Sequence, residues 1–267
     1  MNKVFSDLSG KTVLITGASS GLGESIAYEV SRKGARVILC SRREEKLLTC
    51  LKKCEAISNQ KGAFYPMDIS DYDEVELVLK KIKSNFEEID VLVNCAGMGL
   101  FQLFLESDFK DTEKMFSVNV LGLIYLTQRI ALMMAEKNRG HIINIASQAG
   151  KMATPKSSIY AATKFAVIGF SNSLRLEMKP LGISVTTVNP GPIKTPFFDL
   201  ADPTGNYLES VGKFVLDPEV LAKKIVKSMG TYKREINSPY IMELGSKCYQ
   251  LFPHVGDYLA THVFDKK

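Results

Sequence analysis

Short runs of apolar, often β-branched residues alternate with longer amphipathic segments along this chain. The short runs predict strands at residues 12–16, 36–40, 63–67, 91–94, 141–146, 184–188 and 238–242. The longer segments predict helices at residues 21–32, 43–58, 71–86, 111–136, 158–179 and 218–229. Apolar strands that alternate with helices are typical of a parallel sheet buried on both faces. The pattern therefore predicts a doubly wound α/β fold, a mostly seven-stranded parallel sheet flanked by helices in a Rossmann-like three-layer sandwich.

Length and composition favour one folded domain. The chain has 267 residues, of which 45% are hydrophobic and 24% charged, which is enough for a full core. We expect a single domain over residues 1–267, with a C-terminal extension at about 240–267. The least regular stretch is residues 196–216, which carry Pro, Gly, Asn and aromatic residues. This stretch could close over a substrate, or it could be a plain connection.

Charge and cysteine usage argue against several classes of function. The net charge of +5 is spread along the chain, so we expect no nucleic-acid partner. The five cysteines lack a second pair at metal-ligand spacing and the three histidines are scattered, so we expect free thiols and no metal. We see no signal peptide and no apolar run near the ~20 residues that span a bilayer. These observations predict a cytoplasmic protein without an integral membrane segment.

The first predicted strand runs straight into a glycine-rich turn, the sequence GASSGLG at residues 17–23, and then into a helix. Glycines permit a tight turn and a close approach of the backbone to a pyrophosphate. The start of the helix adds unpaired N–H groups and a positive dipole end. A chance cluster of glycines is the alternative, but the order strand, turn, helix favours nucleotide binding.

The end of the second predicted strand bears on which dinucleotide is bound. In NAD-preferring folds an acidic residue bonds the ribose hydroxyls at this place, whereas here Ser41 is followed by Arg42. A guanidinium suits a 2′-phosphate, which a carboxylate would repel. Arg42 and Arg43 could instead only solvate the start of the next helix. We favour NADP(H) over NAD(H).

A tyrosine and a lysine one helical turn apart are the main candidates for chemistry. Tyr160 and Lys164 occupy positions i and i+4 of a predicted helix and share one face. A free tyrosine titrates near ~10, and a nearby ammonium favours the phenolate, so the pair could exchange protons at neutral pH. Ser147 lies thirteen residues before the tyrosine. Taken alone, the Tyr-x-x-x-Lys pattern is common and usually marks an ordinary helix surface.

Together, the glycine turn, Ser147 and the Tyr160–Lys164 pair resemble the short-chain dehydrogenase/reductase family, over roughly residues 10–195. Residues 94–97, Asn-Cys-Ala-Gly, match the family's Asn-Asn-Ala-Gly signature except at Cys95. Residues 189–195 are similar to the Pro-Gly segment that lies beside the nicotinamide.

Two single residues also match the family pattern. Asp68 lies where the family's aspartate contacts the adenine, although it could merely cap the helix that starts near residue 70. Asn119 matches the catalytic asparagine, although it could be a polar residue within a long helix. The resemblance implies cofactor contacts from Gly17, Ser19, Ser20, Gly21, Leu22, Gly23, Arg42, Asp68, Ile69, Asn94, Ala96, Gly97, Tyr160, Lys164, Pro190, Gly191, Ile193 and Thr195.

The resemblance implies an NADP-dependent oxidoreductase that moves hydride reversibly between the nicotinamide and a carbonyl or alcohol substrate. Tyr160 would protonate the carbonyl oxygen and Ser147 would hydrogen-bond it. Lys164 would lower the pKa of Tyr160 and hold the ribose, while Asn119 would fix a water chain that returns protons. A non-catalytic NADP-binding sensor on the same fold is the alternative. An extended-branch epimerase or dehydratase would need a different glycine spacing.

The substrate is less well defined by the sequence. Contacts are expected from Met98, Ser147, Met152, Tyr160 and Phe197, and the apolar members favour a small or apolar carbonyl or alcohol. The aromatic C-terminal segment could cover the pocket, form a subunit contact or touch a membrane, and we rank the first two above the third. In the family the two long helices commonly pair across a dimer axis, so a homodimer or homotetramer is expected.

Overall fold

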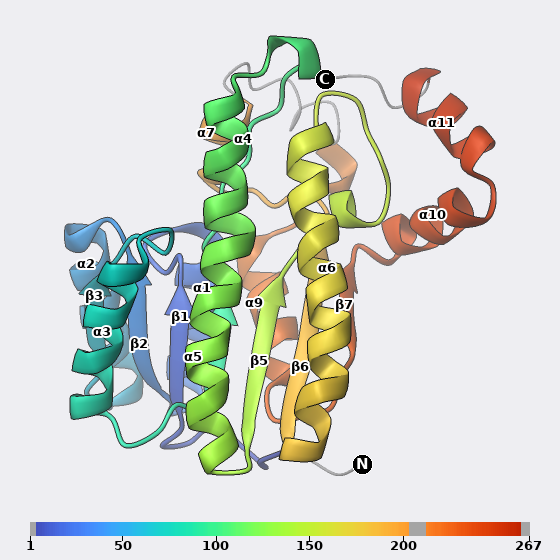
Figure 1. Ribbon diagram of the computed structural model, residues 1–267. Coiled ribbons are helices and arrows are strands. Elements are labelled where there is room, and N and C mark those ends of the chain that lie inside the picture. The colour runs from blue at the N-terminus through green and yellow to red at the C-terminus, as the bar shows by residue number, and fades with distance from the viewer. Residues whose placement is uncertain (1–3, 203–211, 263–267) are drawn as a thin grey trace.

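A parallel sheet of seven strands forms the centre of the molecule (Figure 1). The computed structural model describes residues 4–202 and 212–262. The strand order is β3-β2-β1-β4-β5-β6-β7. The strands are β1 (Thr12–Thr16), β2 (Arg36–Ser41), β3 (Ala63–Pro66), β4 (Val91–Asn94), β5 (Gly140–Ile145), β6 (Ile183–Pro190) and β7 (Glu235–Ser238). The order changes direction between β1 and β4, and in open parallel sheets ligands bind at the carboxyl ends of the strands beside such a switch point.

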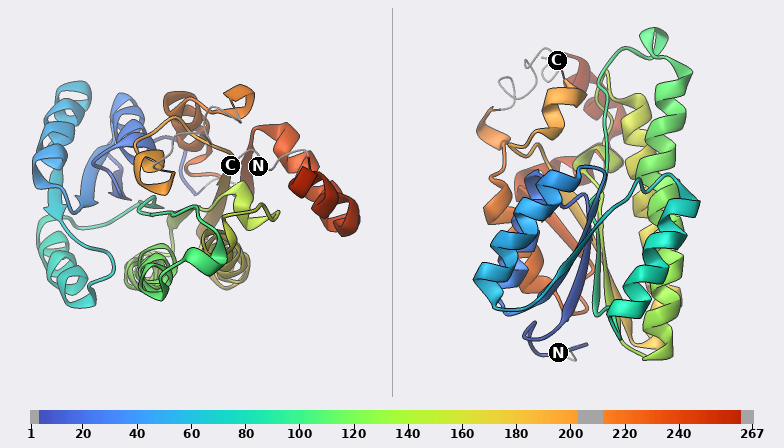
Figure 2. Two further views of the ribbon diagram at one scale, coloured as in Figure 1. Left: turned by 90° about the horizontal axis from the view of Figure 1, so that it is seen from above. Right: turned by 90° about the vertical axis from the view of Figure 1, so that its left-hand side faces the viewer.

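Helices cover both faces of the sheet, which confirms the predicted three-layer sandwich (Figure 2). The helices on one face are α1 (Gly21–Arg32), α2 (Glu44–Ser58) and α9 (Pro218–Ser228). Those on the other face are α3 (Tyr72–Asn85), α5 (Leu123–Glu136) and α6 (Ser158–Met178). Each helix turns an apolar stripe toward the sheet, as Ile26 and Val30 do in α1 and Val78 and Ile82 in α3.

The helix predicted at residues 111–136 contains a wider turn. α4 (Phe109–Phe116) passes through a π-helical turn, η2 (Ser117–Gly122), into α5. Contrary to the sequence-based expectation, Phe109–Glu136 is long and apolar enough to cross a membrane by length and composition, although half of the apolar window is buried. A core helix meets the same criteria, and Leu126 and Ile130 of α5 pack in the core against the sheet.

Short helices occupy several connections at the carboxyl end of the sheet. They are η1 (Phe104–Glu106), η3 (Gln148–Gly150), α7 (Phe197–Ala201) and η5 (Gly212–Phe214). The last two belong to the loop predicted at residues 196–216, of which residues 203–211 lie outside the described part of the chain. Closure of this loop over a substrate stays a prediction.

The prediction of a strand at residues 238–242 is wrong. The strand is β7, which ends at Ser238, and it is followed by α10 (Tyr240–Leu251) and α11 (Pro253–His262). Pro239 has no N–H with which to extend the ladder, so the aromatic and β-branched residues after it enter a helix. We call α10 and α11 the C-terminal arm, which projects from the β7 edge of the sheet (Figure 1).

Candidate active site

The glycine-rich turn between β1 and α1 packs tightly against its neighbours. Gly17 has a φ of +68°, and a Cβ built on it would lie 2.8 Å from the backbone nitrogen of Ala96. A Cβ on Gly23 would collide with the carbonyl oxygen of Gly17. Glycine is therefore required at both positions, and the turn lines the cavity without bulky side chains. Such a turn fits the close approach of a pyrophosphate.

Helix α1 begins beside this turn with an open N-terminus. Its N-cap residue, Ser20, has extended backbone dihedrals, and its hydroxyl makes no capping hydrogen bond. The first backbone N–H groups of a helix lack intrahelical acceptors, and the positive end of the dipole adds to their attraction for an anion. The start of α1 therefore fits a phosphate group.

Arg43 closes the other side of the turn, a contact that the sequence analysis missed. Its guanidinium donates hydrogen bonds to Ser19 Oγ at 2.8 and 3.1 Å. It also donates to Ser20 Oγ at 2.6 Å. The three side chains line the cavity at the end of β2 and form one cationic, hydrogen-bonding cluster. The consecutive arginines at 42 and 43 were the available signal, but sequence alone did not show which one faces the turn.

Arg42 lies toward Asp68, after the end of β3. Its Nη1 is 3.9 Å from Asp68 Oδ2, a distance at the limit for an ion pair. Burial opposes ionisation of Asp68, but hydrogen bonds from Ser70 and the charge of Arg42 lower its pKa overall. The N-cap of α3 is Asp71, so Asp68 does not cap that helix. Asp68 instead lines the cavity next to Ile69.

Thr16 holds the segment that follows β4. Its Oγ1 accepts hydrogen bonds from the backbone N–H groups of Cys95 and Ala96, each at 3.1 Å. The Cys95 side chain, which departs from the family signature, contributes nothing to these bonds. Burial raises the pKa of Cys95 to about 12, so the group is a neutral thiol at physiological pH. Ala96 and Gly97 line the cavity as expected.

Asn94 and Asn119 do not lie in the wall of the cavity. Asn94 donates to the side chains of Thr127 and Asn144, each at 2.8 Å. Asn119 lies in the π-helical turn and pairs with the backbone of Met98: its Oδ1 accepts from the N–H and its Nδ2 donates to the carbonyl, both at 2.8 Å. Asn119 therefore fixes the segment after β4 that carries cavity-lining residues, and Asn94 ties the end of β4 to α5 and β5.

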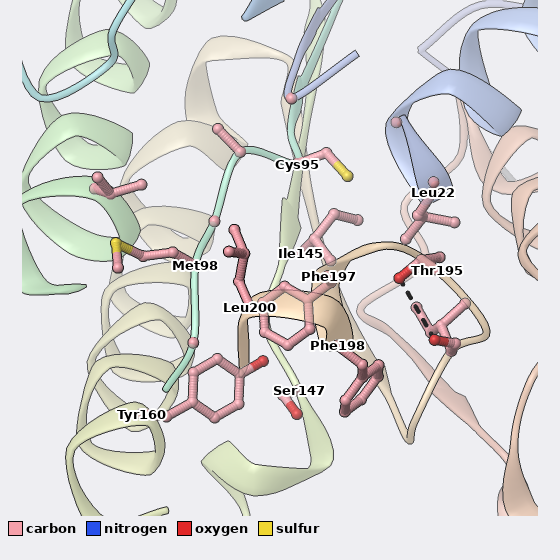
Figure 3. Close-up of a pocket in the computed structure, with 18 of the residues that line it drawn as sticks. Leu22, Cys95, Met98, Ile145, Ser147, Tyr160, Thr195, Phe197, Phe198 and Leu200 are labelled. Carbon is pink, nitrogen blue, oxygen red and sulfur yellow. Dashed lines mark hydrogen bonds between the residues drawn. The ribbon is translucent and has the colours of Figure 1, made fainter. Parts of the chain in front are cut away.

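Ser147, Tyr160 and Lys164 meet at the carboxyl end of β5. Tyr160 and Lys164 share one face of α6, with Lys164 Nζ 5.7 Å from the centre of the Tyr160 ring. Lys164 Nζ donates to the carbonyl of Ile145 at 3.0 Å. Ser147 Oγ accepts from the N–H of Ala149 at 3.1 Å. Figure 3 shows Tyr160 and Ser147 among the residues that line the cavity, and Lys164 lines the same cavity.

Burial changes the acidity of Lys164. The residue is only 5% exposed. Desolvation disfavours the ammonium and lowers its pKa from 10.5 to about 8. Lys164 therefore gains or loses its charge close to physiological pH, directly beside Tyr160.

For the carbonyl reduction that the resemblance implies, this pKa predicts a falling limb in the pH dependence. As pH rises through about 8, Lys164 loses its proton and Tyr160 loses its cationic neighbour, so kcat/KM for the reduced cofactor should decrease. This parameter reports the cofactor-free protein, the state to which the pKa applies. The expected slope is about tenfold per pH unit above the midpoint. Lys164→Arg keeps its charge, so its profile should lack the limb; the same limb in that variant would assign it to another group.

Aromatic rings form one side of the cavity, whose volume is about 680 Å³. Tyr160 contacts Phe101 and Phe197, with ring centres 5.6 and 5.9 Å apart. Phe198 packs edge-on against Phe197 at 5.3 Å (Figure 3). Further apolar lining comes from Met98, Leu100, Met152, Leu200 and Met242. A polar trio beside an apolar wall suits a carbonyl that carries apolar substituents.

The Pro-Gly segment after β6 runs along the same cavity. Its lining residues include Pro190, Gly191, Ile193 and Thr195. The Gly191 N–H donates to the carbonyl of Ser238 at 2.7 Å. A Cβ on Gly191 would lie 2.6 Å from the sulfur of Met242, so this glycine lets α10 reach the cavity. The sequence analysis did not predict that Met242 lines the site.

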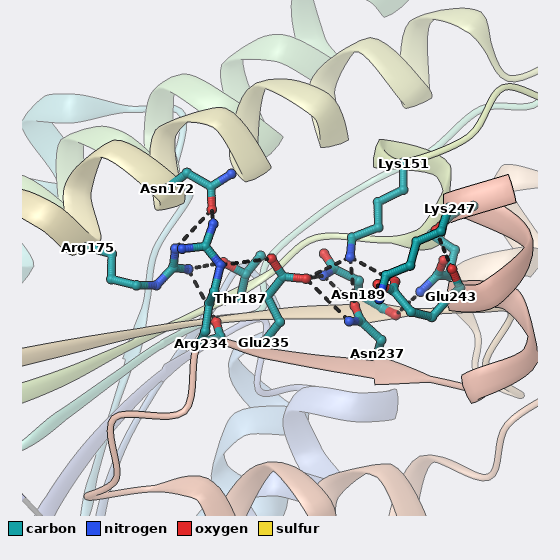
Figure 4. A network of polar contacts seen from close by, with 12 residues as sticks. Lys151, Asn172, Arg175, Thr187, Asn189, Arg234, Glu235, Asn237, Glu243 and Lys247 are labelled. Carbon is teal, nitrogen blue, oxygen red and sulfur yellow. Dashed lines mark hydrogen bonds and ion pairs between the residues drawn. The ribbon is translucent and has the colours of Figure 1, made fainter. Parts of the chain in front are cut away.

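A buried ion cluster connects the loop that carries Ser147 to the C-terminal arm (Figure 4). Lys151 Nζ lies 2.7 Å from Glu235 Oε2 of β7 and 2.8 Å from Glu243 Oε2 of α10. It also donates to Asn237 Oδ1 at 3.1 Å. Burial disfavours ionisation of Glu235, but the hydrogen bond and charge of Lys151 lower its pKa overall. Lys151 follows Ser147 by four residues, so the cluster joins this loop to β7 and α10.

We expect Lys151→Met to lower the free energy of unfolding by about 3 kcal/mol, because two largely buried carboxylates lose their shared cation. Urea denaturation at pH 7 measures the change. The difference from the wild type should shrink as the pH falls through the lowered pKa of Glu235, because its neutral carboxyl no longer depends on the charge of Lys151. The matched control, Lys227→Met on the exposed side of α9, should change stability by less than about 0.5 kcal/mol. Equal losses in the two variants would contradict a special role for the cluster.

Known proteins resemble this chain over most of its length. Residues 11–204 match the family model for short chain dehydrogenases. The chain is 35% identical over 250 residues to the 3-ketodihydrosphingosine reductase of Bos taurus. This alignment covers 90% of this chain and 75% of that protein. It is 36% identical over 227 residues to the 3-dehydrosphinganine reductase of Danio rerio, covering 82% of this chain and 68% of that one.

A solved structure extends the similarity to three dimensions. L-sorbose reductase from Gluconobacter frateurii, complexed with NADPH and L-sorbose, superposes with a TM-score of 0.79 at 27% sequence identity. The match covers 86% of this chain and 95% of that chain. The fold and the family model thus agree with each other.

Proposed function

Because this chain belongs to the short-chain dehydrogenase/reductase family, and so is an oxidoreductase acting on carbonyl or alcohol groups, we propose that it uses NADP(H) to interconvert an apolar ketone and its alcohol. One observation carries the choice of cofactor. The Arg43 guanidinium is held against Ser19 and Ser20 beside the open start of α1. A cation with two hydroxyls at the end of β2 suits a 2′-phosphate.

The cofactor, when bound, supplies or accepts hydride at its nicotinamide. The glycine turn and the start of α1 would hold the pyrophosphate, and Asp68 would bond the adenine end. The Pro190–Thr195 segment would hold the nicotinamide end. The tight packing at Gly17 and Gly23 supports this fit, because any side chain there would disrupt the cradle.

Three residues would carry the proton chemistry. Tyr160 would donate a proton to the substrate oxygen in reduction and accept it in oxidation. Ser147 would donate a hydrogen bond to the same oxygen as negative charge develops on it. Lys164 would place its positive charge beside the tyrosine and hold the ribose. Asn119 would act indirectly by fixing Met98 and the segment after β4.

The apolar wall supports a ketone with a hydrophobic body. Phe101, Phe197 and Phe198 cluster around Tyr160, and methionines and leucines complete the lining. The relatives from Bos taurus and Danio rerio are named as reductases of 3-ketodihydrosphingosine and 3-dehydrosphinganine. Their substrates carry an oxidised third carbon, which supports a ketone here.

A panel assay tests this proposal. Oxidation of NADPH and of NADH is followed with methyl ketones and aldehydes from butanone to heptadecanone, the longer ones in detergent. We expect turnover with NADPH to exceed that with NADH by at least about tenfold, and kcat/KM to rise with alkyl length. Intact NADPH binding without any turnover would instead favour a non-catalytic sensor. A preference for NADH would overturn the cofactor assignment.

We also propose a homo-oligomer. Leu132 of α5 and Phe165 and Leu176 of α6 are exposed apolar side chains on the two long helices. A second copy packed against these helices would cover them. Light scattering of the purified protein gives the mass, and a monomer at micromolar concentration would exclude a stable dimer.

A further inference from the structure

The C-terminal arm exposes an unusual number of apolar side chains. They are Tyr240, Ile241, Leu244, Leu251, Phe252, Val255, Tyr258 and Leu259. Single exposed apolar residues are normal on a protein surface, whereas a contiguous group of this size marks an interaction site. In α11 the apolar positions 255, 258 and 259 repeat with helical spacing, and the described part of that helix has no buried residue.

Helix α10 has its polar face inside and its apolar face outside. The buried residues of α10 are Glu243 and Ser246. Ile241, Leu244 and Leu251, which follow the i, i+3, i+10 spacing of one face, are 60%, 52% and 73% exposed. A surface helix of a water-soluble protein shows the opposite arrangement. The outer face of α10 is therefore suited to an apolar environment.

Although its apolar face points outward, the arm is held to the rest of the fold by ion pairs. Lys151 forms ion pairs with Glu243 at 2.8 Å and with Glu235 at 2.7 Å (Figure 4). Met242 of the same helix lines the catalytic cavity. The arm thus holds its apolar face at a defined place relative to the active site.

Two other segments expose apolar side chains at the same end of the molecule. The segment around η1 contributes Leu103, Phe104, Leu105 and Phe109, of which Leu105 is 95% exposed. Helix α7 contributes Leu200, which is 72% exposed and also lines the cavity. Figures 1 and 2 show η1, α7 and α11 at the end of the molecule toward which the carboxyl ends of the strands point. We call these three groups of residues the apolar rim.

The rim is continuous with the substrate wall. Leu200 is shared by both, and Phe197 and Phe198 precede it in α7 and face the aromatic cluster around Tyr160. Because Leu200 lines the cavity and is 72% exposed, the cavity reaches the surface of the molecule at α7. A second protein chain seated on α7 would cover this opening, whereas a fluid apolar phase would leave it accessible to an apolar substrate.

The charges of the arm also indicate the kind of surface to which it could bind. Over residues 240–262 the formal charges are those of Glu243, Lys247 and Asp257. Glu243 pairs with Lys151 and, at 3.7 Å, with Lys247. Asp257 accepts a hydrogen bond from the Tyr249 hydroxyl at 2.8 Å. The arm therefore lacks the basic face by which proteins are drawn to anionic lipids.

We propose that the apolar rim docks on the surface of a lipid bilayer and that the enzyme takes a long-chain ketone directly from that bilayer. The inference rests on the proposed function for the identity of the substrate, and on the arm, η1 and α7 for the docking. Docking comes from apolar insertion, so a neutral phosphatidylcholine bilayer suffices and salt has little effect.

Vesicle sedimentation tests the docking. The full chain is mixed with phosphatidylcholine vesicles in low salt and in high salt. We expect the triple variant Leu251→Gln, Val255→Gln and Tyr258→Gln to bind at least about tenfold more weakly than the wild type, because three apolar side chains are lost. The matched control replaces exposed residues of other helices, Ile57→Gln, Leu77→Gln and Val220→Gln, and should bind within about twofold of the wild type.

Kinetics separate this inference from the proposed function. With water-soluble butanone the arm variant should keep kcat/KM within about twofold, whereas with heptadecanone carried in vesicles it should lose at least about tenfold. If NADPH is oxidised with neither ketone, the proposed function is contradicted, but the result of the docking experiment still stands. A wild-type protein that stays in the supernatant, or a variant that binds like the wild type, would overturn the docking. A dimer that the arm variant converts to a monomer, with no vesicle binding by the wild type, would assign the rim to a second copy of the chain.

Discussion

Replacing Tyr160 by Phe should abolish turnover while leaving cofactor binding intact. We expect kcat for carbonyl reduction to fall by at least about a thousandfold, because the substrate oxygen would lose the proton donor that we propose for it. The phenyl ring can keep its contacts with Phe101 and Phe197, so the fold should not change. Stopped-flow or steady-state oxidation of NADPH measures the rate, and the quenching or enhancement of cofactor fluorescence measures Kd.

The design separates chemistry from binding. Tyr232→Phe, which removes a hydroxyl from an exposed tyrosine, serves as the matched control and should retain full activity. The Kd for NADPH of Tyr160→Phe should stay within about threefold of that of the wild type. Turnover above one per cent of the wild-type rate would refute the role of Tyr160 as the proton donor. A large loss of NADPH affinity would show that the phenol chiefly holds the cofactor.

Replacing Arg43 by Asp should reverse the preference between the two dinucleotides. The variant loses the hydrogen-bonding cation beside Ser19 and Ser20 and gains a charge that repels a phosphate. We expect kcat/KM for NADPH to fall by about a hundredfold or more, corresponding to at least about 3 kcal/mol. The value for NADH should change little, since NADH has no phosphate at this place.

Arg42→Asp provides the comparison. The Arg42 guanidinium lies 3.9 Å from Asp68, whereas it is Arg43 that donates hydrogen bonds to Ser19 and Ser20 of the glycine turn. The decrease in kcat/KM for NADPH should therefore be at least about tenfold smaller in Arg42→Asp than in Arg43→Asp. Equal effects would mean that both guanidiniums share the phosphate. An unchanged ratio of kcat/KM for the two cofactors in Arg43→Asp would contradict the assignment of this site.

Residue types and spacing were sufficient to predict most of the fold. The predicted β4 and α1 have the bounds of the observed elements, since a short apolar run and a glycine-bounded amphipathic segment each have one reasonable interpretation. The strand expected at residues 238–242 failed for a physical reason. Tyr240, Ile241 and Met242 favour a strand by propensity, but they follow Pro239 and enter a helix whose apolar side is exposed.

The part of the site that lies within one helix could also be predicted from the sequence. Tyr160 and Lys164 are one turn apart, so their proximity follows from helix geometry alone. The choice between Arg42 and Arg43 depends on how the backbone leaves β2, and no spacing rule decides it. Lys151 has its carboxylate partners 84 and 92 residues away. A contact of that range depends on the packing of the complete sheet, so no local sequence pattern indicates it.

The Lys151 cluster has a consequence for synthesis of the chain. During synthesis Lys151 emerges from the ribosome before Glu235 and Glu243 do. Until β7 and α10 have emerged, the loop that bears Ser147 therefore carries a cation without its two carboxylate partners. A chain stopped at residue 234 should therefore expose residues 147–156 to protease, while the full chain protects them. The loop that bears Ser147 would therefore reach its final arrangement only after β7 and α10 have been synthesised and packed.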